Sequence, residues 1–209
     1  DVVIGGGERF FLSRMDGGKR DDHLNLINKI KDNGYDYFNE IDSLKISKTR
    51  NNFYALLAGE GLPEAADRDY TLGELTGIAI NSLKNDSTGF FLMVEGSQID
   101  WGGHDNNKEA ALNELKDFNT AINAALDFAV KDGNTLVIVT ADHETGGLTI
   151  TGGSKDGDTL DVDFVSKDHT GGFVPVFAFG PFSNLFNGIY ENNELCRKII
   201  RLINPWHQF

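Results

Sequence analysis

Two apolar runs without polar alternation constrain the fold of this chain more than any other feature. Residues 90–94 read Phe-Phe-Leu-Met-Val, and residues 135–140 read Thr-Leu-Val-Ile-Val-Thr. Such runs are typical of parallel strands that helices cover on both faces. Between them, residues 108–130 place apolar side chains along one helical face, and Gly133 supplies a stop. The sequence therefore predicts an α/β fold, with a largely parallel sheet flanked by helices.

Weaker signals extend this pattern on both sides of the two runs. Thr71 and Glu74 have the spacing of a capping box, which predicts a helix that continues to Leu83. With 209 residues and 40% hydrophobic content, we expect one domain over residues 1–209. The remaining predictions are strands at 1–4, 53–58 and 174–179, a hairpin from 148–151 and 162–165, and helices at 22–31 and 191–203.

The charge balance excludes one class of partner. The chain has 32 acidic and 19 basic residues, for a formal net charge of -13, which argues against nucleic acid because binding its backbone needs a basic surface. A small phosphate ester would need a strong local positive centre, which bound metal ions could supply. Cys196 is the only cysteine, so no intrachain disulfide forms, and the compartment is left open between a reducing one and the cell exterior.

The ends of the chain and its apolar runs bear on membrane association. No apolar run approaches the ~20 residues that a membrane-spanning helix needs. The chain opens on Asp1-Val2-Val3-Ile4, without an initiator Met or a basic-then-apolar signal sequence. We expect this start to be a cut through a larger protein.

Metal-ligand side chains follow the buried runs. Open parallel sheets bind ligands beyond the carboxyl ends of their strands. Carboxylates and imidazoles in combination suit zinc, manganese or magnesium, with imidazole favouring zinc and lone carboxylates favouring magnesium. The candidate ligands are Glu95, Asp100, His104, Asp142, His143 and His169.

Simpler explanations of these residues stay open at this point. Glu95 could be a solvated group at a strand end, and Asp142 with His143 could cap a helix. Asp100 and His104 reach one centre only if their glycine-containing loop is helical or tightly turned. His169 precedes a predicted strand instead of following one, so its loop would lie at the opposite edge unless the chain doubles back.

Three segments resemble the metal-binding signatures of alkaline phosphatases, in order and in spacing. They are residues 94–104 (VEGSQIDWGGH), 140–147 (TADHETGG) and 169–172 (HTGG). Residues 1–7 also resemble the D-V-x-x-G-G-G segment of that family, which lies well inside the full-length enzyme. The chain thus resembles the carboxyl-terminal portion of an alkaline phosphatase, and the resemblance covers nearly all of it.

The resemblance implies two zinc sites and one magnesium site. Asp100, His104 and His169 would bind the first zinc ion completely. Asp142 and His143 would bind the second zinc ion, and Glu95 would bind magnesium. The resemblance implies that the other ligands of these two sites lie upstream.

The activity implied by the resemblance is hydrolysis of phosphate monoesters through a phosphoserine. The nucleophilic serine and the arginine that binds phosphate would lie upstream of this chain, so the chain alone is expected to be inactive. The family resemblance also implies a homodimer and export to the periplasm or cell exterior. The alternatives are a zinc-binding module without catalysis, or a related phosphodiesterase, sulfatase or phosphomutase.

Two positions depart from the pattern of some relatives. Trp101 follows the proposed zinc ligand Asp100 where some relatives have Lys or His. Thr145 stands where some relatives have a histidine that supports the first zinc site. Changes in the residues that hold ligands commonly alter metal affinity ~10–100-fold, so we expect both departures to affect metal preference.

Overall fold

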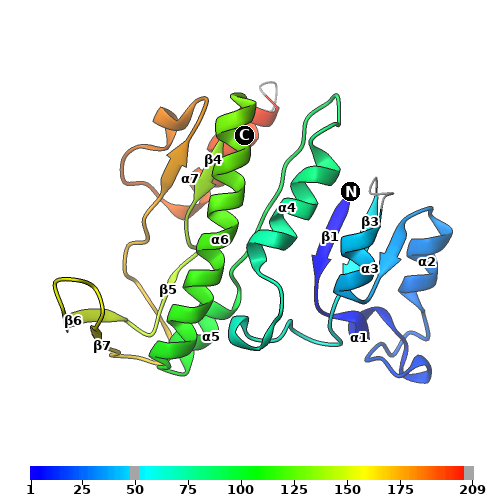
Figure 1. The fold of residues 1–209 in the computed structure, drawn as a ribbon, viewed down its shortest axis with the longest axis horizontal. Coiled ribbons are helices and arrows are strands. Elements are labelled where there is room, and N and C mark those ends of the chain that lie inside the picture. Colours follow the sequence, from blue (N-terminus) through cyan, green and yellow to red (C-terminus); the bar gives the residue numbers. More distant parts are fainter. Residues whose placement is uncertain (48–51, 205–209) are drawn as a thin grey trace. The chain divides into compact units, whose positions relative to one another are not determined.

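The computed structural model describes residues 1–47 and 52–204, which divide into two compact units (Figure 1). The first unit contains residues 1–95 and 117–121. The second contains residues 96–116 and the chain from residue 122 onward. The single domain expected from the sequence stays a prediction.

A three-stranded parallel sheet forms the centre of the first unit. Its strands, in the order β1-β3-β2, are β1 (Val2–Gly5), β3 (Phe53–Leu56) and β2 (Asp36–Phe38). Phe53 lies opposite a residue of each neighbouring strand and is fully buried. It packs with Leu44, Ala55 and Ile78 in the core of this unit. The predicted strands at residues 1–4 and 53–58 are confirmed, and they pair in parallel.

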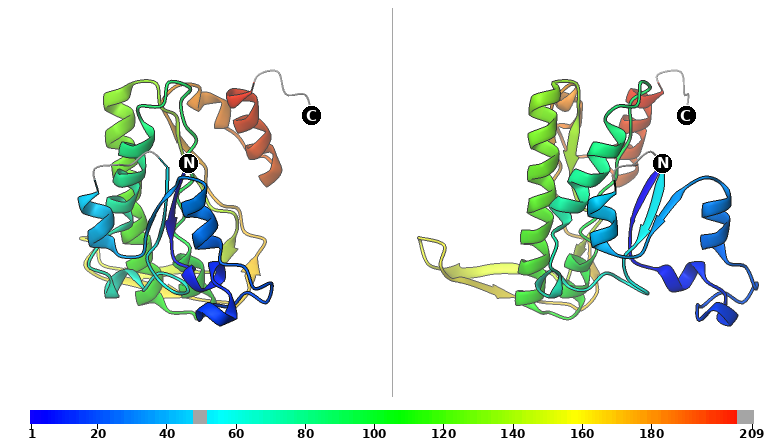
Figure 2. Two further views of the ribbon diagram at one scale, coloured as in Figure 1. Left: turned by 90° about the vertical axis from the view of Figure 1, so that its right-hand side faces the viewer. Right: turned by 45° about the vertical axis from the view of Figure 1, so that its right-hand side comes forward.

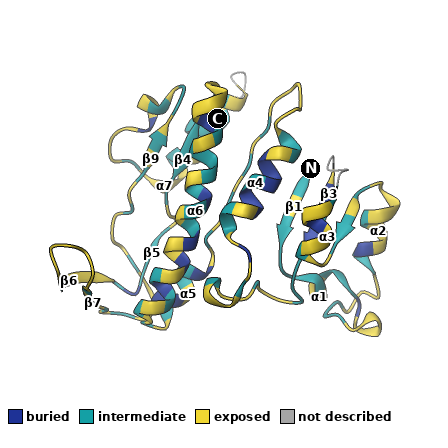
Figure 3. Cartoon of the chain, viewed as in Figure 1, coloured by how far each residue is buried: buried dark blue, intermediate teal, exposed yellow. Residues whose placement is uncertain are grey.

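Along the chain of the first unit, helices alternate with these strands. They are α1 (Glu8–Phe11), α2 (Leu26–Asp32), α3 (Ile41–Ile46) and α4 (Leu72–Leu83), with 3-10 turns at Arg14–Asp16 and Ala65–Asp67. The helix predicted from residue 22 begins four residues later, because the side chain of Asn25 caps it by accepting a hydrogen bond from the amide of Asn28. In α4 the buried residues follow helical spacing (Figure 3).

The predicted capping box at the start of α4 is confirmed. The Thr71 hydroxyl accepts a hydrogen bond from the Glu74 amide at 3.1 Å, and the Glu74 carboxylate accepts one from the Thr71 amide at 2.8 Å. This backbone bond, and then Lys45, lower the pKa of Glu74 from its ordinary value of 4.5. Ionised Glu74 therefore contributes to stability fully above about pH 4.5, its ordinary pKa. This contribution is lost as the pH falls through the lowered pKa of the folded state.

Replacing Thr71 should weaken the first unit measurably. Thr71→Ala leaves the amide of Glu74 without its acceptor, so we expect a loss of about 1 kcal/mol in the free energy of unfolding. Urea titration at pH 7 measures it. Ser87→Ala, at an exposed position after the end of α4, is the matched control and should change stability little. An equal effect of the two substitutions would contradict the capping role.

Residues 90–94 do not form the strand that their sequence predicts. They are assigned to neither strand nor helix, and no strand pairs with them in the part of the chain that the structure describes. Phe91 is 64% exposed and Met93 76% exposed. The strand prediction is wrong here because an apolar run indicates a capacity for burial, whereas a strand also requires a hydrogen-bonded neighbour.

The second unit joins helices to short antiparallel pairs. Its elements are α5 (Gln98–His104), α6 (Lys108–Asp132), β4 (Val137–Val139), β5 (Glu144–Thr145), β6 (Thr149–Gly153), β7 (Leu160–Asp163), β8 (His169–Thr170), β9 (Phe177–Phe179), a 3-10 turn at Ser183–Phe186, and α7 (Asn192–Ile203). The long helix, its stop at Gly133, the terminal helix and the hairpin are confirmed. The hairpin β6–β7 projects away from α5 and α6 (Figure 2).

The strand predicted at residues 135–140 exists but has an antiparallel neighbour. β4 pairs with β9, with Val137 opposite Phe179. A parallel partner for this strand was the wrong expectation, because an apolar run indicates burial on both faces, which is common for parallel strands but does not fix the direction of the neighbouring strand. The α/β fold class is confirmed, with its parallel sheet in the first unit. Among the described residues, none of the helices combines the length and the apolar character needed to cross a membrane.

Candidate metal centre

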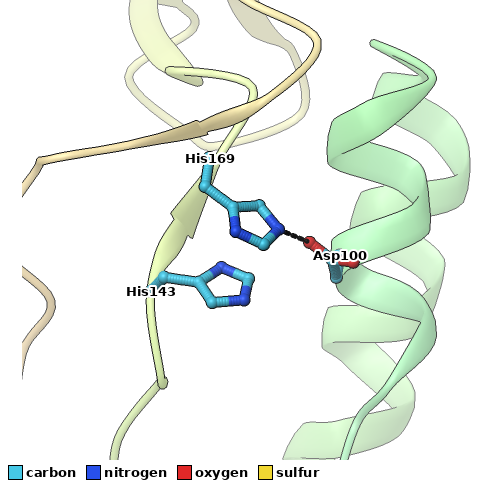
Figure 4. A group of neighbouring side chains, drawn as sticks. All are labelled: Asp100, His143 and His169. Carbon is cyan, nitrogen blue, oxygen red and sulfur yellow. Dashed lines mark ion pairs between the residues drawn. The ribbon is translucent and has the colours of Figure 1, made fainter.

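Three side chains of the second unit converge on one point (Figure 4). Asp100 extends from α5, His143 directly precedes β5, and His169 opens β8. Each offers one ligand atom, and these atoms all lie within 4.8 Å of one another. The Nε2 atom of His169 is 3.6 Å from Oδ1 of Asp100, and the rings of His143 and His169 stack with centroids 3.5 Å apart.

Two more of the predicted ligands adjoin this cluster. The Nε2 atom of His104 lies 3.5 Å from Oδ2 of Asp100. An oxygen of Asp142 lies 3.1 Å from Nε2 of His143, although its side chain is 84% exposed. The structure thus brings together all the predicted ligands except Glu95. Glu95 is exposed and is the last residue of the first unit's main segment, so its role stays a prediction.

The helix α5 explains the pairing of Asp100 with His104. These residues occur in a helix and not in the predicted loop, and a separation of four residues places both side chains on one face. Gly103 allows β5 to approach this helix, since a Cβ atom there would lie 3.0 Å from Thr145 atoms. Gly146 has a φ of +83°, which favours glycine, and a Cβ atom there would lie 2.7 Å from the Gly103 carbonyl oxygen.

The antiparallel pair of β5 and β8 brings His169 to the site. Thr145 lies opposite His169, and Glu144 lies opposite Thr170. The chain therefore doubles back through the hairpin β6–β7 before β8 returns beside β5. This return explains how a histidine that precedes a predicted strand joins ligands that follow strands.

Hydrogen bonds orient two of the imidazole rings. Thr145 donates to Oδ1 of Asp100 at 2.5 Å, so its oxygen accepts from Nδ1 of His143 at 3.2 Å. Nδ1 of His104 donates to the carbonyl oxygen of Lys167, which can only accept. In the neutral form of either ring these contacts place the proton on Nδ1, which leaves the lone pair of Nε2 available to a metal ion.

The resulting donor set fits a divalent cation. Nε2 of His104 and of His143 faces a carboxylate oxygen at 3.5 and 3.1 Å respectively. A positive charge between such nitrogen and oxygen atoms, either a proton on the ring or a bound cation, makes the contact attractive. Imidazole nitrogens with carboxylate oxygens form the ligand set that zinc prefers. The side chains of Asp100 and His143 are 33% and 30% exposed, so the centre is open to solvent on one side.

The sequence alone did not identify two side chains that adjoin the site, Glu144 and Thr170. Thr170 donates to the carboxylate of Glu144, which also accepts from the amides of Gly147 and Leu148. Burial opposes ionisation of Glu144, but these hydrogen bonds outweigh it and lower its pKa. The signal was present as Glu-Thr-Gly-Gly and His-Thr-Gly-Gly, whose side chains alternate between two faces once the segments pair as strands.

Comparison with protein families gives a match over most of the chain. The family described as "Alkaline phosphatase" matches residues 1–160. Alkaline phosphatase 3 of Bacillus subtilis is 32% identical, over 97% of this chain and 58% of that protein. Alkaline phosphatase 4 of the same organism is 33% identical, over 97% of this chain and 57% of that protein. The chain therefore spans somewhat more than half the length of these relatives.

Solved structures agree with the sequence comparison. The alkaline phosphatase from the Antarctic bacterium TAB5 superimposes with a TM-score of 0.86 at 41% identity, over 100% of this chain and 61% of that chain. A mutant of that enzyme with magnesium bound gives a TM-score of 0.85 at 40% identity, with the same coverage.

Proposed function

The chain belongs to the alkaline phosphatase family, and on that premise we propose that it carries the metal-binding part of a phosphate monoester hydrolase. The observation that supports this most directly is the convergence of Asp100, His143 and His169, whose ligand atoms lie within 4.8 Å of one another. A relative with magnesium bound has a closely similar fold. Both agree with a metal-dependent reaction at this point of the second unit.

We assign two zinc sites and one magnesium site. Asp100, His104 and His169 hold the first zinc ion, while Asp142 and His143 hold the second. Glu95 contributes to the magnesium site. When bound, such ions supply positive charge that offsets the charge developing on a transferring phosphoryl group. The Thr145 hydroxyl and the Lys167 carbonyl keep the rings of His143 and His104 turned so that Nε2 faces the metal.

The family implies a phosphate monoester as the substrate, and the charge of the chain agrees with a metal-dependent site for it. With a formal net charge of -13, the chain repels anions in general, so a phosphate monoester is attracted only where metal ions reverse the local field. We propose that the nucleophilic serine lies outside these residues, and that Ser97, at the start of α5, is not the nucleophile. We also propose that the full-length enzyme is a homodimer in the periplasm or outside the cell.

Metal analysis and an activity assay test this proposal together. The chain is loaded with Zn²⁺, dialysed, and assayed for bound zinc and for hydrolysis of p-nitrophenyl phosphate. We expect zinc to be retained and hydrolysis to stay near the background rate. Turnover of about 1–10³ s⁻¹, the usual range of enzymes, would overturn the assignment of the nucleophile to other residues. Absence of zinc under saturating conditions would overturn the metal centre.

A further measurement separates the phosphatase from a zinc-binding module without catalysis. Inorganic phosphate is the product of monoester hydrolysis and should bind the zinc-loaded chain, because the open side of the centre leaves room for an anion. Calorimetric titration with phosphate, with and without EDTA, measures this binding. Zinc binding without any zinc-dependent phosphate binding would favour the non-catalytic module.

A further inference from the structure

The ribbon formed by β5 and β8 has two chemically different faces. Side chains alternate between the faces of a strand, and directly opposed residues share a face. His169 and its partner Thr145 therefore lie on one face, which is the face of the metal centre. Glu144 and its partner Thr170 lie on the other face. The pairing register of β5 with β8 therefore decides which side chains lie on the ligand-bearing face and which lie on the reverse face.

This register has little support from the strands themselves. β5 and β8 contain two residues each, so the backbone ladder is far shorter than an ordinary strand pair. A slip of one residue in pairing moves every side chain to the opposite face. Such a slip would turn His169 away from Asp100 without removing any ligand from the protein.

Glu144 provides the missing support on the reverse face. Its Oε2 atom accepts from the Gly147 amide at 3.0 Å, and its Oε1 atom accepts from the Leu148 amide at 3.1 Å. The Thr170 hydroxyl donates to Oε2 as well. Hydrogen bonds to an ionised carboxylate are about twice as strong as those between neutral groups. One side chain therefore ties the turn after β5 to the strand that bears His169.

We propose that Glu144 is a positioning residue for the metal centre, acting through Thr170 to fix the register of β5 against β8 and thereby hold His169 beside Asp100. The inference rests on the proposed metal-binding function. Glu144 itself binds no metal in this account, because its carboxylate is occupied on the face that points away from the ligands. Its effect reaches the metal through the strand that carries His169.

The chemistry of the contact suggests the informative substitutions. Glu144→Gln keeps the shape of the side chain but replaces one acceptor oxygen with an NH₂ group, which cannot accept from an amide or a hydroxyl. Thr170→Val removes the hydroxyl and keeps the branched shape favoured in strands. Thr170→Ser restores the hydroxyl and serves as the conservative rescue. Glu109→Gln, at an exposed position in the first turn of α6, is the matched control.

Cobalt and zinc are the probes. Zn²⁺ affinity is measured by competition with a chelator, and the visible absorption of bound Co²⁺ reports the geometry of the ligands. We expect Glu144→Gln and Thr170→Val each to lower Zn²⁺ affinity ~10–100-fold and to change the Co²⁺ spectrum. Thr170→Ser and Glu109→Gln should retain the parent values. The double variant Glu144→Gln/Thr170→Val should lose little more than either single variant, since both remove the same contact.

The outcomes separate this inference from the proposed function. If the parent chain binds neither Zn²⁺ nor Co²⁺, the proposed function fails. If the parent binds them and both single variants bind as tightly with the same spectrum, the positioning role of Glu144 fails. Circular dichroism of the metal-free proteins checks folding. Should Glu144→Gln unfold, the comparison of Thr170→Val with Thr170→Ser decides, and equal affinities for that pair would overturn the inference.

Discussion

Replacing Asp100 with alanine is expected to reduce Zn²⁺ affinity by more than the ~100-fold that follows from losing a residue which only holds a ligand in place. Its two oxygens lie 3.5 Å from Nε2 of His104 and 3.6 Å from Nε2 of His169. The same carboxylate accepts the hydroxyl of Thr145, which in turn orients His143. Asp100→Ala thus removes one proposed metal ligand and releases the ring of another, His143.

The measurement is Zn²⁺ binding by chelator competition, with calorimetry as a second method. Asp105→Ala is the matched control, because Asp105 ends the same helix and its side chain is exposed. We expect the control to bind zinc as the parent does. If Asp100→Ala bound zinc as tightly as the parent, Asp100 would not be a metal ligand. The assignment of the first zinc site would then be wrong.

Replacing Asp117 with alanine is expected to lower the free energy of unfolding of the first unit by about 3–5 kcal/mol, the usual cost of breaking a buried ion pair. Arg68 donates to Asp117 at 2.7 Å, and the two side chains are only 4% and 8% exposed. Asp117 also accepts from the Leu72 amide at 3.0 Å, at the positive end of α4. Its loss leaves a buried guanidinium and a helix amide without this acceptor.

Urea unfolding followed by circular dichroism measures this loss. The control is Asp21→Ala, which breaks the solvent-exposed pair of Asp21 with Arg14 and should have almost no effect. The double variant Arg68→Met/Asp117→Leu should be less destabilised than Asp117→Ala, since the guanidinium is removed together with the carboxylate that faces it. A double variant at least as unstable as the single variant would show that the buried guanidinium is not the cause.

Local signals in the sequence predicted helices better than strands. The capping box at Thr71 and the stop at Gly133 act through their immediate neighbours, so the sequence contains all that is needed to place α4 and α6. The partners of strands lie elsewhere in the chain. For this reason the sequence marked residues 135–140 as a strand but not β9 as its antiparallel neighbour, and it assigned a strand at residues 90–94.

In the candidate site too, the sequence indicated relations between neighbouring residues but not contacts between distant segments. The four-residue spacing of Asp100 and His104 was readable from the sequence, but the helix that places both side chains on one face was not, because the sequence predicted a loop there. The sequence named His169 as a candidate ligand, but the pairing of β5 with β8 that brings it to the site joins distant segments and was not readable from the sequence. The contact of Glu144 with Thr170 joins two distant segments, and only the folded arrangement shows it.

The segment at residues 90–94 gives this chain a tendency to aggregate before folding is complete. It contains neither a charge nor a proline, and Phe91 and Met93 stay exposed in the structure. Short segments of this composition can stack into cross-β fibrils when they meet copies of themselves. Natural sequences restrain such stacking with charged gatekeepers at the flanks. Glu95 directly follows the run, so the residue proposed as a magnesium ligand also places a repelling charge beside each stacked copy.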